Sequence, residues 1–288
     1  MRFPLRGLPA AIVAGMLACS PPPKSAAADD SQELRFAIAA NLDSALLEAG
    51  KQDKPERQIA VLAAAAAETL RATTANVLVQ ETLRKVERAE SRDPRALANQ
   101  WRTAVTEARD ILSFKPLIEA PLPVGFPDPT PVGEIRVQHY PAYRLARTEM
   151  TLLEGRAFWT LFNHIKQREI AMTAPVEMSY SSQKSGALDK TSMSFLYRTT
   201  EQGRLETDGK VAVVDVPAQS AVSIGLQGDA ATQRVNDAKV RLENWLRDHR
   251  EEYQAAGPLR VLAYNSPFVA DRKKLIEVQI PVAASPRP

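Results

Sequence analysis

The chain has 288 residues, of which 44% are hydrophobic and 25% are charged, a composition typical of a soluble globular protein with one or two domains. Its formal net charge is +3, and Arg2 and Arg6 contribute two of these positive charges from an N-terminal segment that export would remove. The remaining chain is nearly neutral, which excludes the broad basic surface that nucleic-acid binding needs. We therefore expect no nucleic-acid partner.

The N-terminus has the layout of an export signal. The two arginines precede an apolar run at residues 8–18, which is too short to span a bilayer. The run ends at Cys19, the only cysteine of the chain, and here the sequence resembles a lipobox, in which the thiol is lipidated and becomes the mature N-terminus. Ser20 follows, which by resemblance to Gram-negative lipoproteins implies the outer membrane. The alternative is an ordinary signal peptide that is cleaved after Ala28.

We therefore predict a signal peptide at residues 1–18 and an exported, periplasmic protein that a lipid on Cys19 anchors to the outer membrane. Residues 19–30 are of low complexity and predict a flexible tether. Residues 31–114 repeat apolar side chains at helical spacing. The clearest helix begins at Asp93-Pro94, where the carboxylate can cap free N–H groups and the proline suits the first turn.

These helices, three or four in number, predict a small bundle with closely packed alanine seams. We assign this helical domain to no family, and one role open to it is to recruit a protein partner. Between residues 115 and 131 the prolines are Pro116, Pro121, Pro123, Pro127, Pro129 and Pro131. Proline cannot continue a helix or donate to a sheet ladder, so this segment predicts a stiff linker and the domain boundary.

From residue 132 to residue 283 the pattern changes to strands. We expect strands at residues 135–138, 143–149, 170–180, 193–199, 211–216, 222–226, 259–264 and 275–280. A helix in EGRAFWTLFNHIKQ and a second one over residues 235–246 interrupt them, so the order strand–strand–helix–strand–strand occurs twice. The sequence therefore predicts an α+β protein: a helical bundle, then a distorted antiparallel β-barrel with two flanking helices.

The segments HYPAYRLARTE, REIAMTAPVEM and GPLRVLAYNSPF occur in this order, and with them the chain resembles the SOUL, or haem-binding-protein, family over about residues 132–282. The MTAPV block at 172–176 and the YNSP turn at 264–267 are specific to that family in this order and spacing. The resemblance implies the barrel with two flanking helices described above. It also implies non-covalent binding of haem or a related tetrapyrrole.

Binding of a tetrapyrrole requires an apolar face for the ring, cations for the propionates and, for haem, often an axial ligand for the iron. The residues that can form the apolar face are Phe158, Leu161, Phe162 and Ile165 of the first helix. The cations that can pair with propionates are Arg144, Arg147, Lys166 and Arg168. By the resemblance, His139 matches the histidine that ligates haem iron in the animal SOUL protein.

Each candidate has a structural alternative. The apolar stripe can be barrel core, because any helix packed on a sheet needs one. His139 can be an inert histidine in an exposed His-Tyr-Pro-Ala turn. We interpret His164 as a packing residue, His249 as solvated, and Met172 as part of a structural strand and turn.

The sequence contains no known catalytic motif: no HExxH, CxxC, GxSxG or P-loop is present. We therefore expect a binding protein rather than an enzyme, acting as a haem carrier, buffer or sensor in the cell envelope. Two alternatives stay open, a binding module for other amphipathic small molecules and an envelope protein-interaction scaffold.

Overall fold

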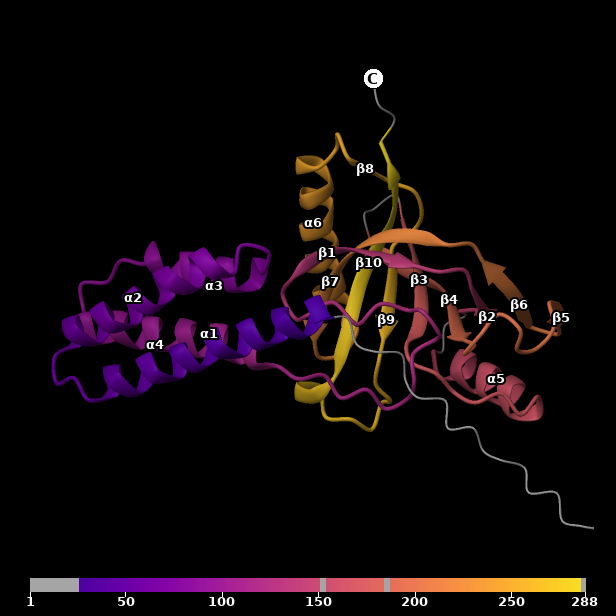
Figure 1. Cartoon of the computed structure of the whole chain (residues 1–288), viewed down its shortest axis with the longest axis horizontal. Helices are drawn as coiled ribbons and strands as arrows, with labels where there is room; N and C mark the ends of the chain where they lie inside the picture. Colours follow the sequence, from indigo (N-terminus) through magenta and orange to yellow (C-terminus); the bar gives the residue numbers. More distant parts are fainter. Residues whose placement is uncertain (1–25, 151–153, 184–186, 286–288) are drawn as a thin grey trace, which may run out of the picture.

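The computed structural model describes residues 26–150, 154–183 and 187–285. The predicted signal peptide and Cys19 lie outside the described residues. Within the described part, a helical unit and a sheet unit lie side by side, which confirms the α+β class with a helical N-terminal part (Figure 1). None of the helices in these ranges is both long enough and apolar enough to cross a membrane.

Four helices precede the sheet in the described chain: α1 (Ala26–Gly50), α2 (Pro55–Ala72), α3 (Val77–Glu87) and α4 (Pro94–Ser113). Helix α1 begins inside the stretch predicted as a tether. Helix α4 begins as predicted, since the Asp93 carboxylate accepts a hydrogen bond from the Arg95 N–H at 2.9 Å. The alanine seams are also confirmed by the buried residues Ala39, Ala49, Ala66, Ala104 and Ala108.

The sheet unit has ten strands among the described residues: β1 (Ile135–Tyr140), β2 (Tyr143–Glu149), β3 (Val176–Ser182), β4 (Leu188–Leu196), β5 (Glu206–Asp208), β6 (Val211–Val216), β7 (Gln219–Gln227), β8 (Tyr253–Ala255), β9 (Arg260–Ala263) and β10 (Leu275–Ala284). All the pairs are antiparallel, in the order β1-β7-β10-β9-β3-β4-β2-β6-β5, with β8 on β10. This path is open, so the closed barrel stays a prediction.

Two helices cover the sheet at the predicted places, α5 (Glu154–Gln167) and α6 (Thr232–Asp248), and the single turn η1 (Asp271–Lys273) precedes β10. The strand order shows the predicted repeat. Strands β1, β2, β3 and β4 of the first half correspond to β6, β7, β9 and β10 of the second half. The run β1-β7-β10-β9 on one side of the sheet therefore matches the run β6-β2-β4-β3 on the other. The two halves meet where β9 pairs with β3. Helix α5 contacts β2, β4 and β6, whereas α6 contacts β7, β10 and β8. The first strand of each half therefore pairs with the second strand of the other half.

The exchange of first strands produces one long antiparallel ribbon. Tyr140 pairs with Gln219 and Tyr143 pairs with Val216, so that β1–β2 and β7–β6 share a single register. Pro-Ala at residues 141–142 therefore faces Pro-Ala at 217–218, and the ladder is interrupted at the same place on both strands, where proline offers no N–H. His139, expected in a turn, instead lies within β1, because the strand continues to Tyr140.

The sheet has an apolar outer face, whereas its inner face mixes polar side chains with apolar ones such as Leu145, Leu196 and Leu262, because side chains alternate along each strand. On the outer face, Ile276, Val278 and Ile280 of β10 belong to the core that α5 and α6 cover. The inner face carries buried polar side chains, namely Glu177, Ser192, Ser194, Ser223, Arg260, Glu277 and Gln279. A buried sheet face with this many polar groups is unusual, because each group needs a hydrogen-bonding partner.

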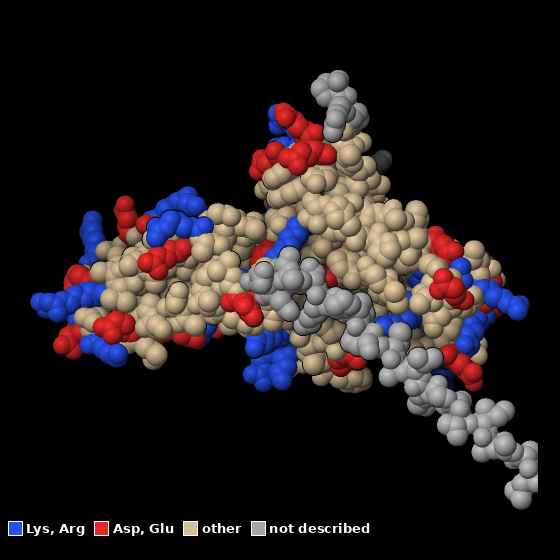
Figure 2. Space-filling view, viewed as in Figure 1, with Lys and Arg blue, Asp and Glu red and all other residues tan. Residues whose placement is uncertain are grey.

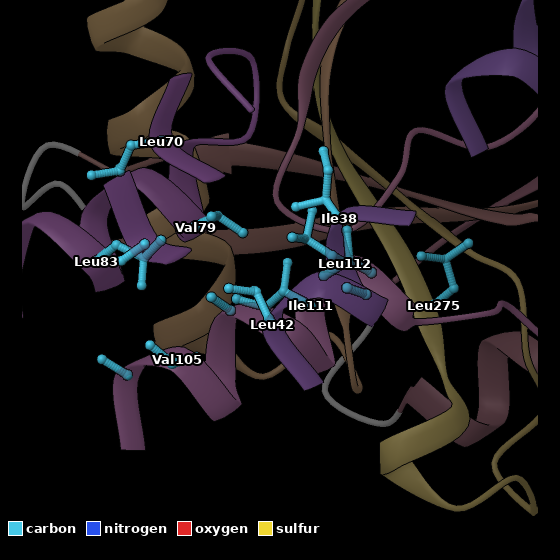
Figure 3. Close-up of a cluster of buried hydrophobic side chains, with 14 of the residues drawn as sticks. Ile38, Leu42, Leu70, Val79, Leu83, Val105, Ile111, Leu112 and Leu275 are labelled. Carbon is cyan, nitrogen blue, oxygen red and sulfur yellow. The ribbon is translucent and has the colours of Figure 1, made fainter. Parts of the chain in front are cut away.

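The core of the helical unit continues into the sheet unit. Ile38 and Leu42 of α1 and Leu112 of α4 belong to the same buried cluster as Leu275 of β10 (Figure 3). At the surface, Arg241 of α6 makes a bidentate ion pair with Glu81 of α3, with nitrogen–oxygen distances of 2.9 and 2.7 Å. On the view in Figure 2, acidic and basic side chains are mixed on the helical unit, with no large area of one sign.

Residues 117–130, here called the strap, cross the inner face of the sheet. Their prolines keep them out of helix and strand, but the strap is hydrogen-bonded along its length. The Pro121 carbonyl accepts from the Ala174 N–H at 3.1 Å, and the Val124 N–H donates to the Arg198 carbonyl at 2.9 Å. The strap is therefore part of the folded sheet unit, although proline content alone predicts only a linker.

Gly225 of β7 lies directly beneath the end of the strap. A Cβ atom at this position would overlap the carbonyl oxygen of Thr130, so the crossing requires glycine. We predict that Gly225→Ala lowers the free energy of unfolding by about 2–4 kcal/mol, because backbone must move to admit the methyl group. Urea-induced unfolding measures the change.

The matched control is Gly155→Ala in α5, where an added Cβ meets nothing within 4 Å. This substitution should leave stability unchanged or raise it by up to about 1 kcal/mol. Equal losses in the two variants would contradict the close approach of the strap to β7.

Candidate binding site

Helix α5 carries an aromatic face beside its buried stripe. Leu161 and Ile165 are core residues, so these two of the four residues in the predicted apolar stripe serve packing rather than ligand binding. Phe158 and Phe162 lie half-buried with their rings stacked, 6.1 Å between centroids and 12° between planes. Trp159 is 60% exposed and stands edge-on to both rings, at 5.7 and 5.5 Å. We call Phe158, Trp159 and Phe162 the α5 aromatic face.

Two of the predicted propionate-binding cations are already engaged. Arg144 forms two hydrogen bonds with the Asp215 carboxylate, at 2.7 and 2.9 Å, and these bonds raise the pKa of Arg144. Arg168 is paired with Glu206 and Asp208, at 2.7 and 2.8 Å. A ligand carboxylate would have to displace these partners.

The other two cations are less constrained. Arg147 lies on the inner side of β2, opposite to Arg144, and its Nη2 is 4.0 Å from the Glu177 carboxylate. Lys166 is exposed and follows Phe162 by one helical turn. Among the described residues no carboxylate lies within ion-pair distance of Lys166. Of the four candidates, Lys166 is therefore both unpaired and next to the α5 aromatic face.

His139 is exposed on β1, and its ring is held by one hydrogen bond between Nδ1 and the Ser220 hydroxyl, at 2.8 Å. This bond fixes the ring and leaves Nε2 accessible, an arrangement that suits a metal ligand. However, α5 packs on β2, β4 and β6, whereas His139 lies in β1 against Ser220 of β7, a strand that α6 covers. The structure does not bring His139 to the α5 aromatic face.

The other two histidines have local structural roles. His164 is buried, and its Nε2 lies 3.1 Å from the Tyr197 hydroxyl, in agreement with a packing residue. His249 was expected in solvent, but it stacks on Trp245 with ring centroids 3.8 Å apart and follows the last residue of α6. Within the described ranges, no group of three or more His, Cys, Asp or Glu residues is placed to hold a metal ion.

The two signature turns hold the strap. In the MTAPV block, which includes Met172, the Thr173 hydroxyl donates to the Leu196 carbonyl at 2.6 Å and the next N–H binds the strap. In the YNSP turn, Asn265 donates to the Leu117 carbonyl at 2.5 Å, and the Ser266 N–H donates to the Glu119 carboxylate at 2.6 Å. These motifs therefore have a structural function here.

The inner face contains a hydrogen-bonded carboxylate, Glu277, that sequence reasoning missed. It accepts hydrogen bonds from the Thr130 N–H of the strap at 2.7 Å, from the Ser223 hydroxyl at 2.9 Å, and from the Tyr264 hydroxyl. Burial, and then this neighbouring negative charge, raise the pKa of Tyr264 well above its ordinary value. Glu277 ties the strap, β7 and the YNSP turn together.

A second inner-face cluster surrounds Arg260, which was also missed. Its Nη1 donates to the Tyr143 hydroxyl at 2.8 Å and to Glu177 at 3.2 Å, and its Nε donates to Gln279 at 2.9 Å. The guanidinium lies 5.0 Å from the ring centroid of Tyr140. Burial, and then Glu177, raise the pKa of Tyr143. Nη2 of Arg260 is buried without a partner.

Comparison with known proteins identifies the sheet unit. The sequence model of the family described as "SOUL heme-binding protein" matches residues 130–281. No curated protein matches the chain.

Three solved structures illustrate the structural likeness. The C-terminal domain of EcmrR is 15% identical, with 52% of this chain and 97% of that chain covered and a TM-score of 0.40. An uncharacterized conserved protein from Listeria innocua is 12% identical, with 54% and 94% covered and a TM-score of 0.41. SAV2435 bound to tetraphenylphosphonium is 11% identical, with 52% and 94% covered and a TM-score of 0.32. Likeness at this level carries no information on function.

We predict that His164 makes stability dependent on pH. Burial, and then the charge of Arg168, lower the pKa of His164, so the unfolded state binds this proton more readily than the folded state. The stability that neutral His164 provides is complete above about pH 6.5 and is lost as the pH falls below that value.

The test compares the wild type with His164→Gln by thermal unfolding between pH 8 and pH 5. At pH 8 the variant should be less stable by about 1 kcal/mol, because the packing and the bond to Tyr197 change. The difference should shrink as the pH falls. A difference that stays constant over this range would show that His164 does not titrate with unfolding.

Proposed function

We propose that this chain, which belongs to the SOUL heme-binding protein family through residues 130–281, binds haem or a related tetrapyrrole non-covalently and without catalysing a reaction. The supporting observation is the α5 aromatic face, which lies beside an unpaired lysine in a domain of a haem-binding family. A carrier, a buffer or a sensor would all use such a site.

The residues on α5 fit the two parts of a tetrapyrrole, its apolar ring and its propionates. The ring is flat and apolar, and stacked or edge-on aromatic side chains bind such surfaces favourably. The parallel rings of Phe158 and Phe162 and the exposed ring of Trp159 would hold the macrocycle. Lys166, one turn further along, would pair with a propionate without losing an existing partner.

We also propose a location in the cell envelope, with a lipid on Cys19. The support is the N-terminal sequence, in which a basic and apolar segment ends at this cysteine. Helix α1 begins at Ala26, so a lipid on Cys19 would keep the first residue of α1 within about 25 Å of the membrane surface. Ser31 and Arg35 of α1 line one pocket with Thr130 and Leu275, so the anchor would hold the junction of the two units near the membrane, within reach of a membrane-bound protein partner.

Haemin titration tests the binding proposal. We expect a saturable change of the Soret band and quenching of tryptophan fluorescence, with a smaller quenching amplitude in Trp159→Phe, in which Trp101 and Trp245 remain. The double variant Phe158→Ala/Phe162→Ala should bind at least about tenfold more weakly, equivalent to about 1.4 kcal/mol of lost contact. Val240→Ala, which shortens an exposed apolar side chain of α6, is the matched control and should bind as the wild type does.

The position of the Soret band in His139→Ala decides where the iron lies. We expect an unchanged band, because β1 does not reach the α5 aromatic face. A shifted band would place the iron at His139 and contradict a site on α5. Absence of any saturable change in the wild type would exclude tetrapyrroles and leave another amphipathic ligand or a scaffold role.

Metabolic labelling tests the anchor. We expect the full chain, expressed in a Gram-negative host, to incorporate radiolabelled palmitate and to fractionate with the outer membrane. Cys19→Ser should abolish both, because lipidation requires the thiol. Label that persists in Cys19→Ser, or a wild type that is released as a soluble periplasmic protein, would contradict the proposed anchor.

A further inference from the structure

Phe126 of the strap fills an aromatic slot on the inner face of the sheet. Its ring is edge-on to Tyr140 at 5.0 Å and to Tyr143 at 5.1 Å between centroids. The segment that carries it lies between two anchored residues, Val124 and Asp128, which bond to Arg198 and Gln138. Phe126 itself makes a turn bond to the Pro123 carbonyl at 3.2 Å. The ring is thus held by its aromatic contacts.

The same two tyrosines contact Arg260, whose Nη1 donates to the Tyr143 hydroxyl and whose guanidinium lies 5.0 Å from the Tyr140 ring centroid. The side chain of Arg260 is only 6% exposed, and its Nη2 has no hydrogen-bond partner. A buried guanidinium N–H without an acceptor is costly. Phe126 supplies a ring to this slot but no acceptor. The slot therefore holds an aromatic ring but contains no hydrogen-bond acceptor for Nη2 of Arg260.

A small cavity shares Tyr143 with the slot. It has a volume of about 170 Å³, and its lining includes Val124 of the strap, Tyr143 and Arg198. The cavity therefore offers room for part of a ligand beside Tyr143.

The charges of the inner face favour a neutral ligand. Arg260 and Glu177 balance one another at 3.2 Å, while Arg147, which is 4.0 Å from Glu177, has a side chain that is 42% exposed and screened by solvent. Glu277 adds a further buried carboxylate, whose partners are all neutral donors. A ligand carboxylate would bring another negative charge into this low-dielectric region, which is unfavourable. A carbonyl oxygen would satisfy the arginine without that repulsion.

We propose that the slot occupied by Phe126 is a second ligand site, separate from the α5 aromatic face, for an uncharged aromatic molecule that carries a carbonyl group. The ligand ring replaces that of Phe126 against Tyr140 and Tyr143, and its carbonyl oxygen accepts a hydrogen bond from Nη2 of Arg260. In the absence of ligand the strap fills the slot, so Phe126 competes with the ligand. This site does not require that tetrapyrroles bind.

The test uses three probes of nearly equal shape: acetophenone, with a carbonyl; ethylbenzene, without an acceptor; and benzoate, with a negative charge. Calorimetric titration of the full chain with Phe126→Ala should show acetophenone binding at least tenfold more tightly than ethylbenzene or benzoate. The wild type should bind acetophenone at least tenfold more weakly than the variant does. Phe114→Ala, which removes the half-buried ring just before the strap, is the control and should behave as the wild type.

Three results would overturn the proposal. Equal binding of acetophenone and ethylbenzene to Phe126→Ala would mean that Arg260 does not donate a hydrogen bond to the ligand carbonyl. Such a result is expected if a water molecule already accepts that hydrogen bond. Tightest binding of benzoate would mean a site for anions. No binding of any probe would mean that the slot closes when the ring is removed.

Two further measurements support the assignment if the probes behave as expected. In Phe126→Ala/Arg260→Met the preference for acetophenone should vanish, and if that variant does not fold, the probe series alone decides. Saturating acetophenone should leave haemin binding to Phe126→Ala unchanged. Displacement of haemin would show that the two ligands share one site, which would refute a separate second site but not tetrapyrrole binding.

Discussion

The buried carboxylate of Glu277 is the interaction on which the arrangement of this chain depends. A charge in the interior must be hydrogen-bonded, because leaving it unpaired costs several kcal/mol. Here the donors come from three distant places, namely the strap at Thr130, β7 at Ser223 and the YNSP turn at Tyr264. The strap must therefore stay on the inner face, and the helical unit that precedes it is drawn against the sheet.

The same dependence explains what the sequence could and could not predict about the fold. Helical spacing located α5 and α6, and alternation located most strands, because these signals are local. In LIEVQI, Glu277 and Gln279 alternate with apolar residues, a pattern that ordinarily indicates a solvent-exposed face. That face is buried because the strap, 147 positions earlier at Thr130, covers it. Proline-rich sequence carries no periodic signal from which such a contact could be predicted.

In the candidate site, too, local features could be predicted from the sequence and contacts between distant strands could not. Phe158 and Phe162 could be found from their helical spacing, and Trp159 lies at the edge of the same face. The separation of Arg144 from Arg147 was also accessible, since residues three apart on a strand point to opposite sides of the sheet. The pairing of Arg144 with Asp215 was not, because it depends on β2 lying beside β6. That neighbour follows from the exchange of first strands between the halves.

The repeat in the sheet unit provides an internal comparison that separates packing from function. Helices α5 and α6 cover equivalent strands, so both need a buried apolar stripe, and both have one. On α6, Trp245 is half-buried and stacked on His249. On α5, Trp159 is 60% exposed beside two half-buried phenylalanines. Phe158 and Phe162 pack partly on the core, with Phe158 edge-on to buried Phe195 at 5.2 Å, so packing accounts for these two rings but not for the exposed Trp159. An exposed aromatic ring beside two half-buried ones is a surface on which a flat apolar ligand can bind.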